Sequence, residues 1–200
     1  MTAKELGSRE RLLEHLTVLR CQAGDADAFA RLYRKYRGGV RAYLSRFVGP
    51  DAAEDALQEV WVTVYRRIAQ LTDPGRFRVW LFRIARSRAF DALRREKRRQ
   101  ALWHAAAREA SEVEKPDVET ALWDLPDRGV ETAMAHLSPE HREVLQLRFF
   151  QDLEYAEIAA VVGCPIGTIR SRLYHAKAAV REVLTRMNPS PQGGRQGGVP

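Results

Sequence analysis

The spacing of apolar residues constrains the fold of this chain most strongly. Between residues 29 and 47 they recur every three or four positions: Phe29, Leu32, Tyr33, Tyr36, Val40, Leu44 and Phe47. This period places them on one face of an α-helix. Similar series run from Ala56 to Leu71 and from Phe77 to Leu93. No segment alternates convincingly between apolar and polar side chains, as a half-buried strand would. The sequence therefore predicts an all-α fold.

Turn signals separate these predicted helices. Pro50 interrupts the pattern, and Asp51 with Glu54 is a predicted N-cap with its partner three residues later. The stretch "TDPGR" at residues 72–76 has turn chemistry, in which we expect Gly75 to adopt a positive φ. Residues 1–24 are expected to add a helix through its leucines, to which we assign no function: Leu12, Leu13, Leu16 and Leu19.

Charge is distributed unevenly along the chain. Residues 76–99 contain ten Arg or Lys and two acids, a balance of +8 that exceeds the net charge of +7 of the whole chain. Residues 101–131 contain three basic and eight acidic side chains, a balance of −5, together with two prolines and one glycine. We interpret this stretch as a flexible acidic linker between two small helical domains. The last residues, "NPSPQGGRQGGVP", are expected to be disordered.

Bulk properties exclude several classes of protein. The basic excess favours a polyanionic partner. Only Cys21 and Cys164 are present, far apart, so neither a disulfide framework nor a metal site is indicated. No apolar run approaches the roughly 20 residues of a membrane span, and the start of the chain lacks the apolar centre of a signal peptide. We expect a cytoplasmic protein without membrane insertion.

The segment "YAEIAAVVGCPIGTIRSRL" predicts a helix-turn-helix. Such a motif needs a small residue where the two helices cross and a turn residue that tolerates a positive φ, and Ala159 and Gly163 supply these. Apolar residues around them would fix the interhelical angle: Ile158, Val162, Ile166 and Ile169. Upstream, Ser138 and Pro139 predict the N-terminus of another helix.

The second helix of this motif would begin near Pro165 and present a basic, hydrogen-bonding face. No acid occurs between residues 164 and 180, whereas a solvated surface helix normally mixes both signs. This pattern favours insertion into a DNA major groove over a merely basic surface helix. The residues that we expect to contact DNA are Pro165, Gly167, Thr168, Arg170, Ser171, Arg172, Tyr174, His175 and Lys177.

Three stretches in order resemble a bacterial sigma factor. The helix-turn-helix is similar to the C-terminal domain of these proteins, "DAAEDALQEVWVTVYRRI" to the helix that grips core RNA polymerase, and "FRVWLFRIARSRAFDALRREKRR" to the helix that melts and binds the minus-10 element. The spacing leaves no room for the central domain of primary sigma factors. The resemblance, over about residues 25–184, is therefore to the extracytoplasmic-function (ECF) group.

The resemblance implies a role for each domain and its partners. Predicted partners are core RNA polymerase, promoter DNA and an anti-sigma factor, with no cofactor and no small-molecule substrate. Polymerase would contact Asp55, Gln58, Glu59 and Trp61. The minus-10 element would contact Arg76, Trp80, Arg83, Arg86, Ser87, Arg88, Asp91, Arg94 and Arg95. The C-terminal helix would read the minus-35 element.

Several of these assignments have a structural alternative. The Trp61 and Trp80 rings also fit core positions, and the acidic face of the polymerase helix also fits an ordinary solvated surface. Primary sigma factors carry two tryptophans where this chain has Trp80 and Leu81, a departure that implies weaker melting. The linker is either a soluble tether or, by resemblance, a segment that threads the RNA-exit path of the polymerase.

The predicted organisation has five parts. Residues 1–24 form an N-terminal extension, 25–100 the region 2 domain, 101–131 the linker, 132–187 the region 4 domain and 188–200 a tail. No catalytic constellation is present among the five His residues or the acids, so we expect no enzyme. The alternatives are a helix-turn-helix regulator that acts without core polymerase and a basic RNA-binding or structural protein. The first lacks the strands of a receiver domain, and the second lacks exposed aromatic repeats.

Overall fold

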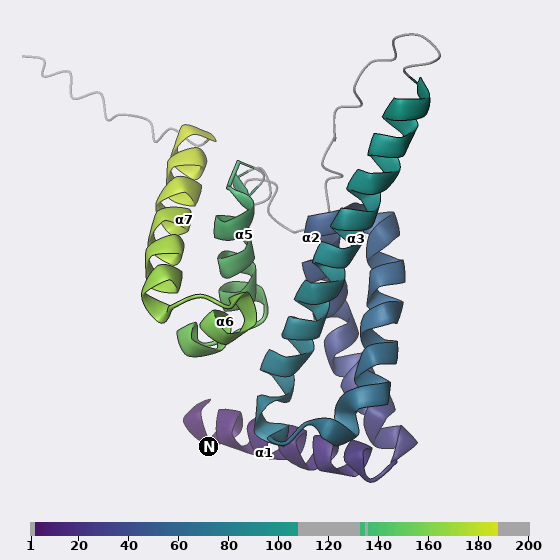
Figure 1. Ribbon diagram of the computed structural model, residues 1–200. Helices are drawn as coiled ribbons and strands as arrows, with labels where there is room; N and C mark the ends of the chain where they lie inside the picture. The colour runs from purple at the N-terminus through teal and green to yellow at the C-terminus, as the bar shows by residue number, and fades with distance from the viewer. Residues whose placement is uncertain (1–2, 108–132, 135, 188–200) are drawn as a thin grey trace, which may run out of the picture.

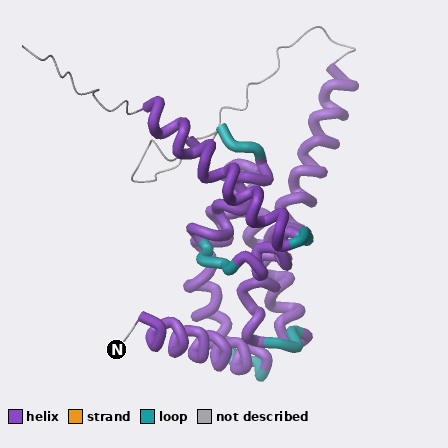
Figure 2. The backbone as a smooth tube through the Cα atoms, turned by 90° about the vertical axis from the view of Figure 1, so that its left-hand side faces the viewer, coloured by secondary structure: helices purple, strands orange, loops and turns teal. Residues whose placement is uncertain are grey.

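The computed structural model describes residues 3–107, 133–134 and 136–187, and the predicted linker from residue 108 and the tail lie outside them. Every regular element in this part of the chain is a helix, as Figures 1 and 2 show. The predicted all-α fold, with a C-terminal helix-turn-helix, is confirmed. None of the described helices is long and apolar enough to cross a membrane.

Helices α1 (Ala3–Gln22), α2 (Ala26–Arg67) and α3 (Phe77–Ala107) form the N-terminal domain, with short turns η1 (Ile68–Gln70) and η2 (Pro74–Arg76) before α3. Helices α2 and α3 stand side by side and α1 crosses their lower end (Figure 1). Helix α3 continues past residue 100, where the predicted linker begins, to Ala107. The α1 leucines at 12, 13, 16 and 19 are exposed, and α1 packs inward through Val18 and Cys21 instead.

Two details of the predicted helix boundaries and turns are wrong. The break within α2 lies at Gly49, whose φ of 77° and ψ of 171° are non-helical, so Asp51 lies inside the helix and is not its N-cap. Glycine tolerates this backbone because it has no Cβ, and Pro50 follows as a first helical residue. Gly75 does not have a positive φ, because Asp73 caps a 3₁₀ turn there by accepting a hydrogen bond from the Gly75 N–H.

The C-terminal domain contains α5 (Pro139–Leu145), a π-helical turn η3 (Gln146–Phe150), α6 (Tyr155–Val162) and α7 (Ile166–Met187). Ser138 caps α5, with Pro139 in the first turn, as predicted. Gly163 ends α6 in the left-handed conformation with φ 77° and ψ 37°. The predicted turn residue of the helix-turn-helix is therefore confirmed.

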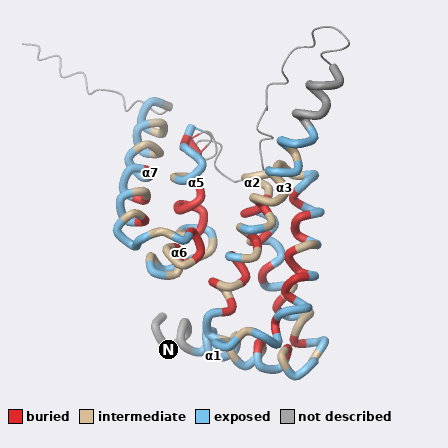
Figure 3. The backbone as a smooth tube through the Cα atoms, viewed as in Figure 1, coloured by how far each residue is buried: buried red, intermediate tan, exposed pale blue. Residues whose placement is uncertain are grey.

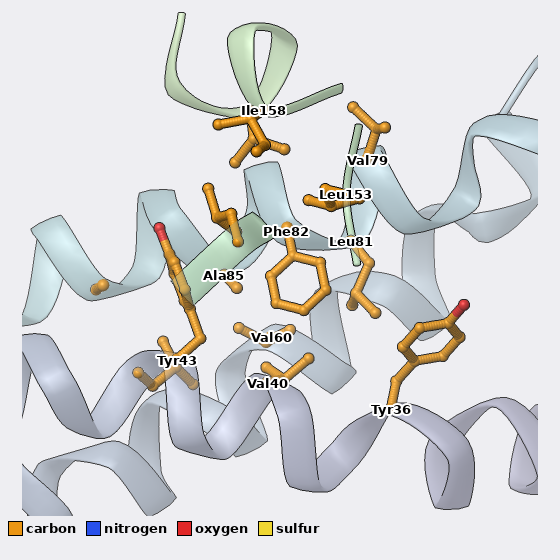
Figure 4. Packing of buried hydrophobic residues seen from close by; sticks show 14 of the residues in the cluster. Tyr36, Val40, Tyr43, Val60, Val79, Leu81, Phe82, Ala85, Leu153 and Ile158 are labelled. Atoms are coloured by element: carbon orange, nitrogen blue, oxygen red, sulfur yellow. The ribbon is translucent and has the colours of Figure 1, made fainter. Parts of the chain in front are cut away.

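One hydrophobic core runs through both domains. Buried residues line the inner faces of α2, α3, α5 and α6 (Figure 3). Leu153 and Ile158 of the C-terminal domain point toward Val79 and Phe82 of α3 in Figure 4. All four of these side chains are at most 8% exposed. The two domains therefore pack against each other through α3 and α6.

Candidate nucleic-acid interface

Helix α7 is fixed on the C-terminal domain by its apolar side. Ile169, Leu173 and Ala176 are at most 2% exposed and face α5 and α6. Ile166, which we expected to help lock the motif, is 40% exposed instead. The rest of α7 lies on the outer side of the domain, away from α2 and α3 (Figure 1). The helix therefore presents its polar side to solvent.

The predicted minus-35 residues share this outward face. Thr168 and Arg172 are half-buried, and the other seven are exposed: Pro165, Gly167, Arg170, Ser171, Tyr174, His175 and Lys177. Within the described residues no hydrogen bond or ion pair engages the Arg170 guanidinium. The Tyr174 and His175 rings meet edge to face at 5.4 Å, and the Lys177 ammonium lies 5.1 Å from the Phe149 ring centroid. The exposed Phe149 ring therefore supports a basic side chain.

The arginines of α3 point in two directions. On one side, Arg95 forms an ion pair with Glu59 of α2 at 2.9 Å, and Arg88 lies 4.0 Å from the same carboxylate. Arg88 also donates to the Thr63 hydroxyl at 3.0 Å. Asp91 accepts from Arg94 on its own helix. The contacts of Arg88 and Arg95 with Glu59 and Thr63 hold α2 and α3 together.

On the other side, three α3 arginines reach the C-terminal domain. The Arg83 Nε donates to the Ala160 carbonyl at 2.8 Å. The Arg86 Nε donates to the Glu143 carboxylate at 2.9 Å, and Arg78 lies 3.3 Å from the Glu157 carboxylate. We call Arg78, Arg83 and Arg86 the domain-facing arginines.

Glu143 is the most buried acid of this interface, at 4% exposed. Its Oε1 accepts from both the Arg86 guanidinium and the Tyr43 hydroxyl, the latter at 2.7 Å. Burial, and then the adjacent Glu143 carboxylate, raise the pKa of Tyr43 well above its ordinary value, so the phenol stays protonated and can donate. A buried carboxylate needs such partners, because an unpaired buried charge is strongly unfavourable.

A groove of about 520 Å³ opens where α3 meets α6. Its α3 wall is basic and contains one aromatic ring, Phe90, over which the Arg86 guanidinium lies at 4.6 Å. Val161 of α6 forms the opposite wall. The remaining lining residues are Arg83, Ser87 and Arg94.

The structure brings the predicted minus-10 residues together on α3, but all of the arginines among them have protein partners. Arg76 pairs with Asp73 at 3.3 Å, in addition to the contacts above. Ser87 is exposed, whereas Trp80 is half-buried with its ring 6.1 Å from Phe77. Trp80 therefore packs against the core, as the alternative interpretation predicted.

The predicted polymerase residues divide in a similar way. Asp55 and Gln58 are exposed on α2, and Glu59 is half-buried against the α3 arginines. Trp61 is only 6% exposed, and its ring meets Phe29 and Tyr33 edge to face. The indole therefore lies in the core and not on the exposed face of α2, because α2 turns residue 61 toward Phe29 and Tyr33 in the first half of the same helix.

Sequence reasoning missed the polar contacts between the domains. Glu143, Tyr43 and Arg78 were not singled out, since their partners lie 57 to 100 residues away along the chain. No local signal marked Glu143, because it follows His141 and Arg142 directly and has the sequence context of an ordinary exposed acid. Within the described ranges, no group of three or more potential metal ligands lies together.

Comparison with protein families identifies both domains. The family described as "Sigma-70 region 2" matches residues 32–99, and "Sigma-70, region 4" matches residues 127–180. These matches agree with the positions of α2, α3 and the helix-turn-helix.

Three curated relatives are similar over most of this chain. The ECF RNA polymerase sigma-E factor of Haemophilus influenzae is 30% identical, covering 88% of this chain and 97% of the relative. Sigma-E of Escherichia coli K12 is 31% identical, covering 86% and 94%. BldN of Streptomyces coelicolor is 36% identical over 84% of this chain, which spans 64% of BldN.

Two solved structures share the fold. CnrH, in complex with the cytosolic domain of CnrY, has a TM-score of 0.61 at 23% identity, covering 86% of this chain and 97% of CnrH. The sigma factor RpoE from Bartonella quintana, in complex with the anti-sigma factor NepR, also has a TM-score of 0.61 at 23% identity. It covers 78% of this chain and 96% of RpoE.

Proposed function

The chain belongs to the ECF group of sigma-70 family RNA polymerase sigma factors, and we propose that its two domains divide promoter recognition between α3 and α7. As a member of this family it is not an enzyme but directs promoter-specific initiation of transcription. The assignment of individual residues to polymerase, minus-10 and minus-35 contacts is our proposal.

The exposed polar face of α7 is the observation that carries this proposal. Arg170 and Ser171 lie in the N-terminal half of the helix, where a helix-turn-helix meets base edges in the major groove. An arginine there can donate two hydrogen bonds to guanine, and a hydroxyl can donate or accept. Arg172, His175 and Lys177 would add contacts to phosphates, which set affinity more than sequence.

Helix α3 would bind the minus-10 element with its arginines and the groove beside Phe90. Opening a duplex exposes unstacked bases, which proteins hold on aromatic rings or in snug polar pockets. The groove lined by Phe90, Ser87 and Arg94 has both kinds of surface. Because Trp80 packs against the core, we assign it a role in shaping this helix rather than in stacking on a base.

The polymerase contact would centre on the exposed acidic side of α2. Asp55 and Gln58 are accessible, and Glu59 is shared with α3. We place Trp61 behind this surface as a support, since its ring is buried.

We further propose that an anti-sigma factor controls this chain and that it works in the cytoplasm, where core polymerase is found. The support is fold similarity to RpoE, whose solved structure contains the anti-sigma factor NepR. The acidic linker would pass along a basic path of the polymerase, which its charge balance of −5 favours.

Run-off transcription tests the function directly. Purified chain and core polymerase would be incubated with a library of genomic fragments, and the transcripts sequenced. We expect initiation at a common pair of elements spaced as minus-35 and minus-10. A helix-turn-helix regulator would instead bind operator DNA in the absence of polymerase and give no new start sites. That result would overturn the proposal.

A further inference from the structure

We propose that Gln22, the last residue of α1, is a positioning residue for minus-10 recognition, because its side-chain amide fixes the turn between α2 and α3 in the place from which Arg76 meets DNA. The inference rests on the proposed function of Arg76 in minus-10 binding. It gives α1, for which we saw no function in the sequence, a part in promoter recognition.

A side chain from a distant part of the sequence holds the α2–α3 turn, which comprises residues 68–76 with η1 and η2. The Gln22 Nε2 donates to the Ile68 carbonyl at 3.0 Å and to the Leu71 carbonyl at 2.7 Å. An amide nitrogen has two N–H donors, so both are used here. Leu71 follows η1 with an extended backbone, so these carbonyls lie where the chain leaves α2. Gln22 therefore fixes the direction in which the turn starts.

The position of Gln22 is itself fixed by its neighbours in the chain. Helix α1 ends at Gln22, and Gly24 follows with a φ of 88°, a left-handed conformation that favours glycine. Asp25 then caps α2 by accepting a hydrogen bond from the backbone of its first turn at 2.9 Å. Val18 and Cys21, at most 7% exposed, anchor the same end of α1 in the core. The Gln22 amide therefore projects from a rigid base.

Helix α1 also contacts the other end of the α2–α3 turn. It crosses beneath this turn in Figure 1, and both η1 and η2 pack against it. At Gly75, a Cβ would lie 3.6 Å from the His15 Nδ1 of α1. The backbone of the turn is therefore in van der Waals reach of α1 near its end, and hydrogen-bonded to α1 at its start.

The α2–α3 turn presents Asp73 and Arg76 to solvent, with side chains 54% and 79% exposed. The Asp73 carboxylate accepts from the Gly75 N–H at 2.9 Å and lies 3.3 Å from the Arg76 guanidinium. Phe77, directly after Arg76, is fully buried and begins α3. The backbone of Arg76 is therefore fixed on one side by the core and on the other side by the turn that Gln22 holds.

Loss of the Gln22 amide would leave the Leu71 carbonyl free to turn toward water. Asp73 and Arg76 follow within five residues and would shift with it. A side chain that recognises a ligand must be held within about 0.5 Å of its productive position, which supporting hydrogen bonds of this kind achieve. Gln22 would therefore affect minus-10 binding through Arg76, without touching DNA itself.

A double-mutant cycle in the full chain tests the proposal. Gln22→Leu removes both N–H donors and keeps a side chain of similar size, and Arg76→Ala removes the guanidinium. The matched control is Ala23→Leu, which adds the same leucine at the neighbouring, exposed residue. Gln22→Asn is a second variant with the same expected result, because its shorter side chain cannot reach both carbonyls. Circular dichroism would confirm that each protein keeps its helical content.

The affinity of each reconstituted holoenzyme would be measured by fluorescence anisotropy. The probe is a fluorescein-labelled promoter fork that contains a single-stranded minus-10 element and lacks the minus-35 element. Arg76→Ala and Gln22→Leu should each weaken binding about tenfold, since a hydrogen bond to a charged group contributes at least this factor. The double variant should bind no more weakly than the weaker single variant, because two residues that act through one contact are not additive. Ala23→Leu should bind as the unsubstituted chain does.

The outcomes separate this inference from the proposed function. If Arg76→Ala weakens binding but Gln22→Leu binds as Ala23→Leu does, the positioning role of Gln22 is refuted and the function of Arg76 stands. The same conclusion follows if Gln22→Leu weakens binding by the same factor with and without Arg76, because Gln22 would then act only on the general stability of the domain. If Arg76→Ala leaves binding unchanged, the assignment of Arg76 to the minus-10 element is overturned, and the inference with it.

Discussion

Helices α3 and α7 are both rich in arginine, but their charges are differently available. Every arginine predicted to contact the minus-10 element has an acidic or carbonyl partner within the protein. On α7, Arg170 has none among the described residues. The number of basic residues in a sequence therefore does not show how much positive charge a surface can offer to DNA.

The two helices therefore differ in what they must do before they bind DNA. Helix α7 can meet DNA without breaking an ion pair at Arg170, whereas α3 must release acids before it binds phosphates. Exposed pairs such as Arg76–Asp73 and Arg95–Glu59 contribute only about 0–1 kcal/mol each, so they exchange readily. The buried Glu143 carboxylate holds Arg86 more firmly, because an unpaired buried charge is strongly unfavourable. We therefore expect binding through α3 to depend on the holoenzyme more strongly than binding through α7.

The largest expected effect is on minus-35 selectivity. Replacing Arg170 and Ser171 with Ala should reduce the preference for a matched over a scrambled minus-35 element by about 10- to 100-fold, since a good arginine–base contact contributes about 1–3 kcal/mol. Competition binding by the reconstituted holoenzyme would measure this preference.

Arg186→Ala is the matched control, because this residue lies near the end of the same helix and pairs with Glu182. It should leave selectivity unchanged, and both proteins should bind core polymerase equally well. Loss of polymerase binding by the double variant would contradict the division of labour between the domains.

A somewhat smaller effect is expected on the stability of the α7 domain. Gly163→Ala places a Cβ at a residue with φ of 77°, a conformation that costs an L-residue about 1–2 kcal/mol. The midpoint of thermal unfolding, followed by circular dichroism, should fall. Gly167→Ala, where the new Cβ meets nothing within 4 Å, should leave it equal or higher. Equal midpoints for the two variants would show that the turn does not limit stability.

The elements of this fold follow from local sequence signals. The spacing of apolar residues gives the helices, Ser138 and Pro139 give the start of α5, and Gly163 gives the turn of the helix-turn-helix. The break in α2 lies at Gly49 and not at the predicted N-cap Asp51, because the glycine can adopt the non-helical backbone of the kink without a Cβ clash. Local patterns thus predict helices better than their exact ends.

The site was predictable only in part, for a physical reason. Exposure of the α7 face follows from its amphipathic period, which the sequence contains. The partners of Arg86 and Arg83 are set by packing between segments 57 and 77 residues apart, which no local pattern encodes. The burial of Trp61 depends likewise on where Phe29 and Tyr33, from the first half of α2, meet the ring. Long-range packing decides which charged residues remain available.

The smallest expected effect distinguishes two neighbouring acids of α2. Glu59 holds Arg95 at 2.9 Å and Arg88 at 4.0 Å, whereas Asp55 is exposed and is in no ion pair within 4.0 Å in the described structure. Glu59→Gln should therefore lower the free energy of unfolding by about 0.5–1 kcal/mol, and Asp55→Asn should not change it. If both acids contact polymerase, both variants should bind core polymerase more weakly. Equal stability of the two variants, measured by urea unfolding, would mean that Glu59 does not hold Arg88 and Arg95 with measurable strength. The contrast between α3 and α7 would then rest on Arg78, Arg83 and Arg86 alone.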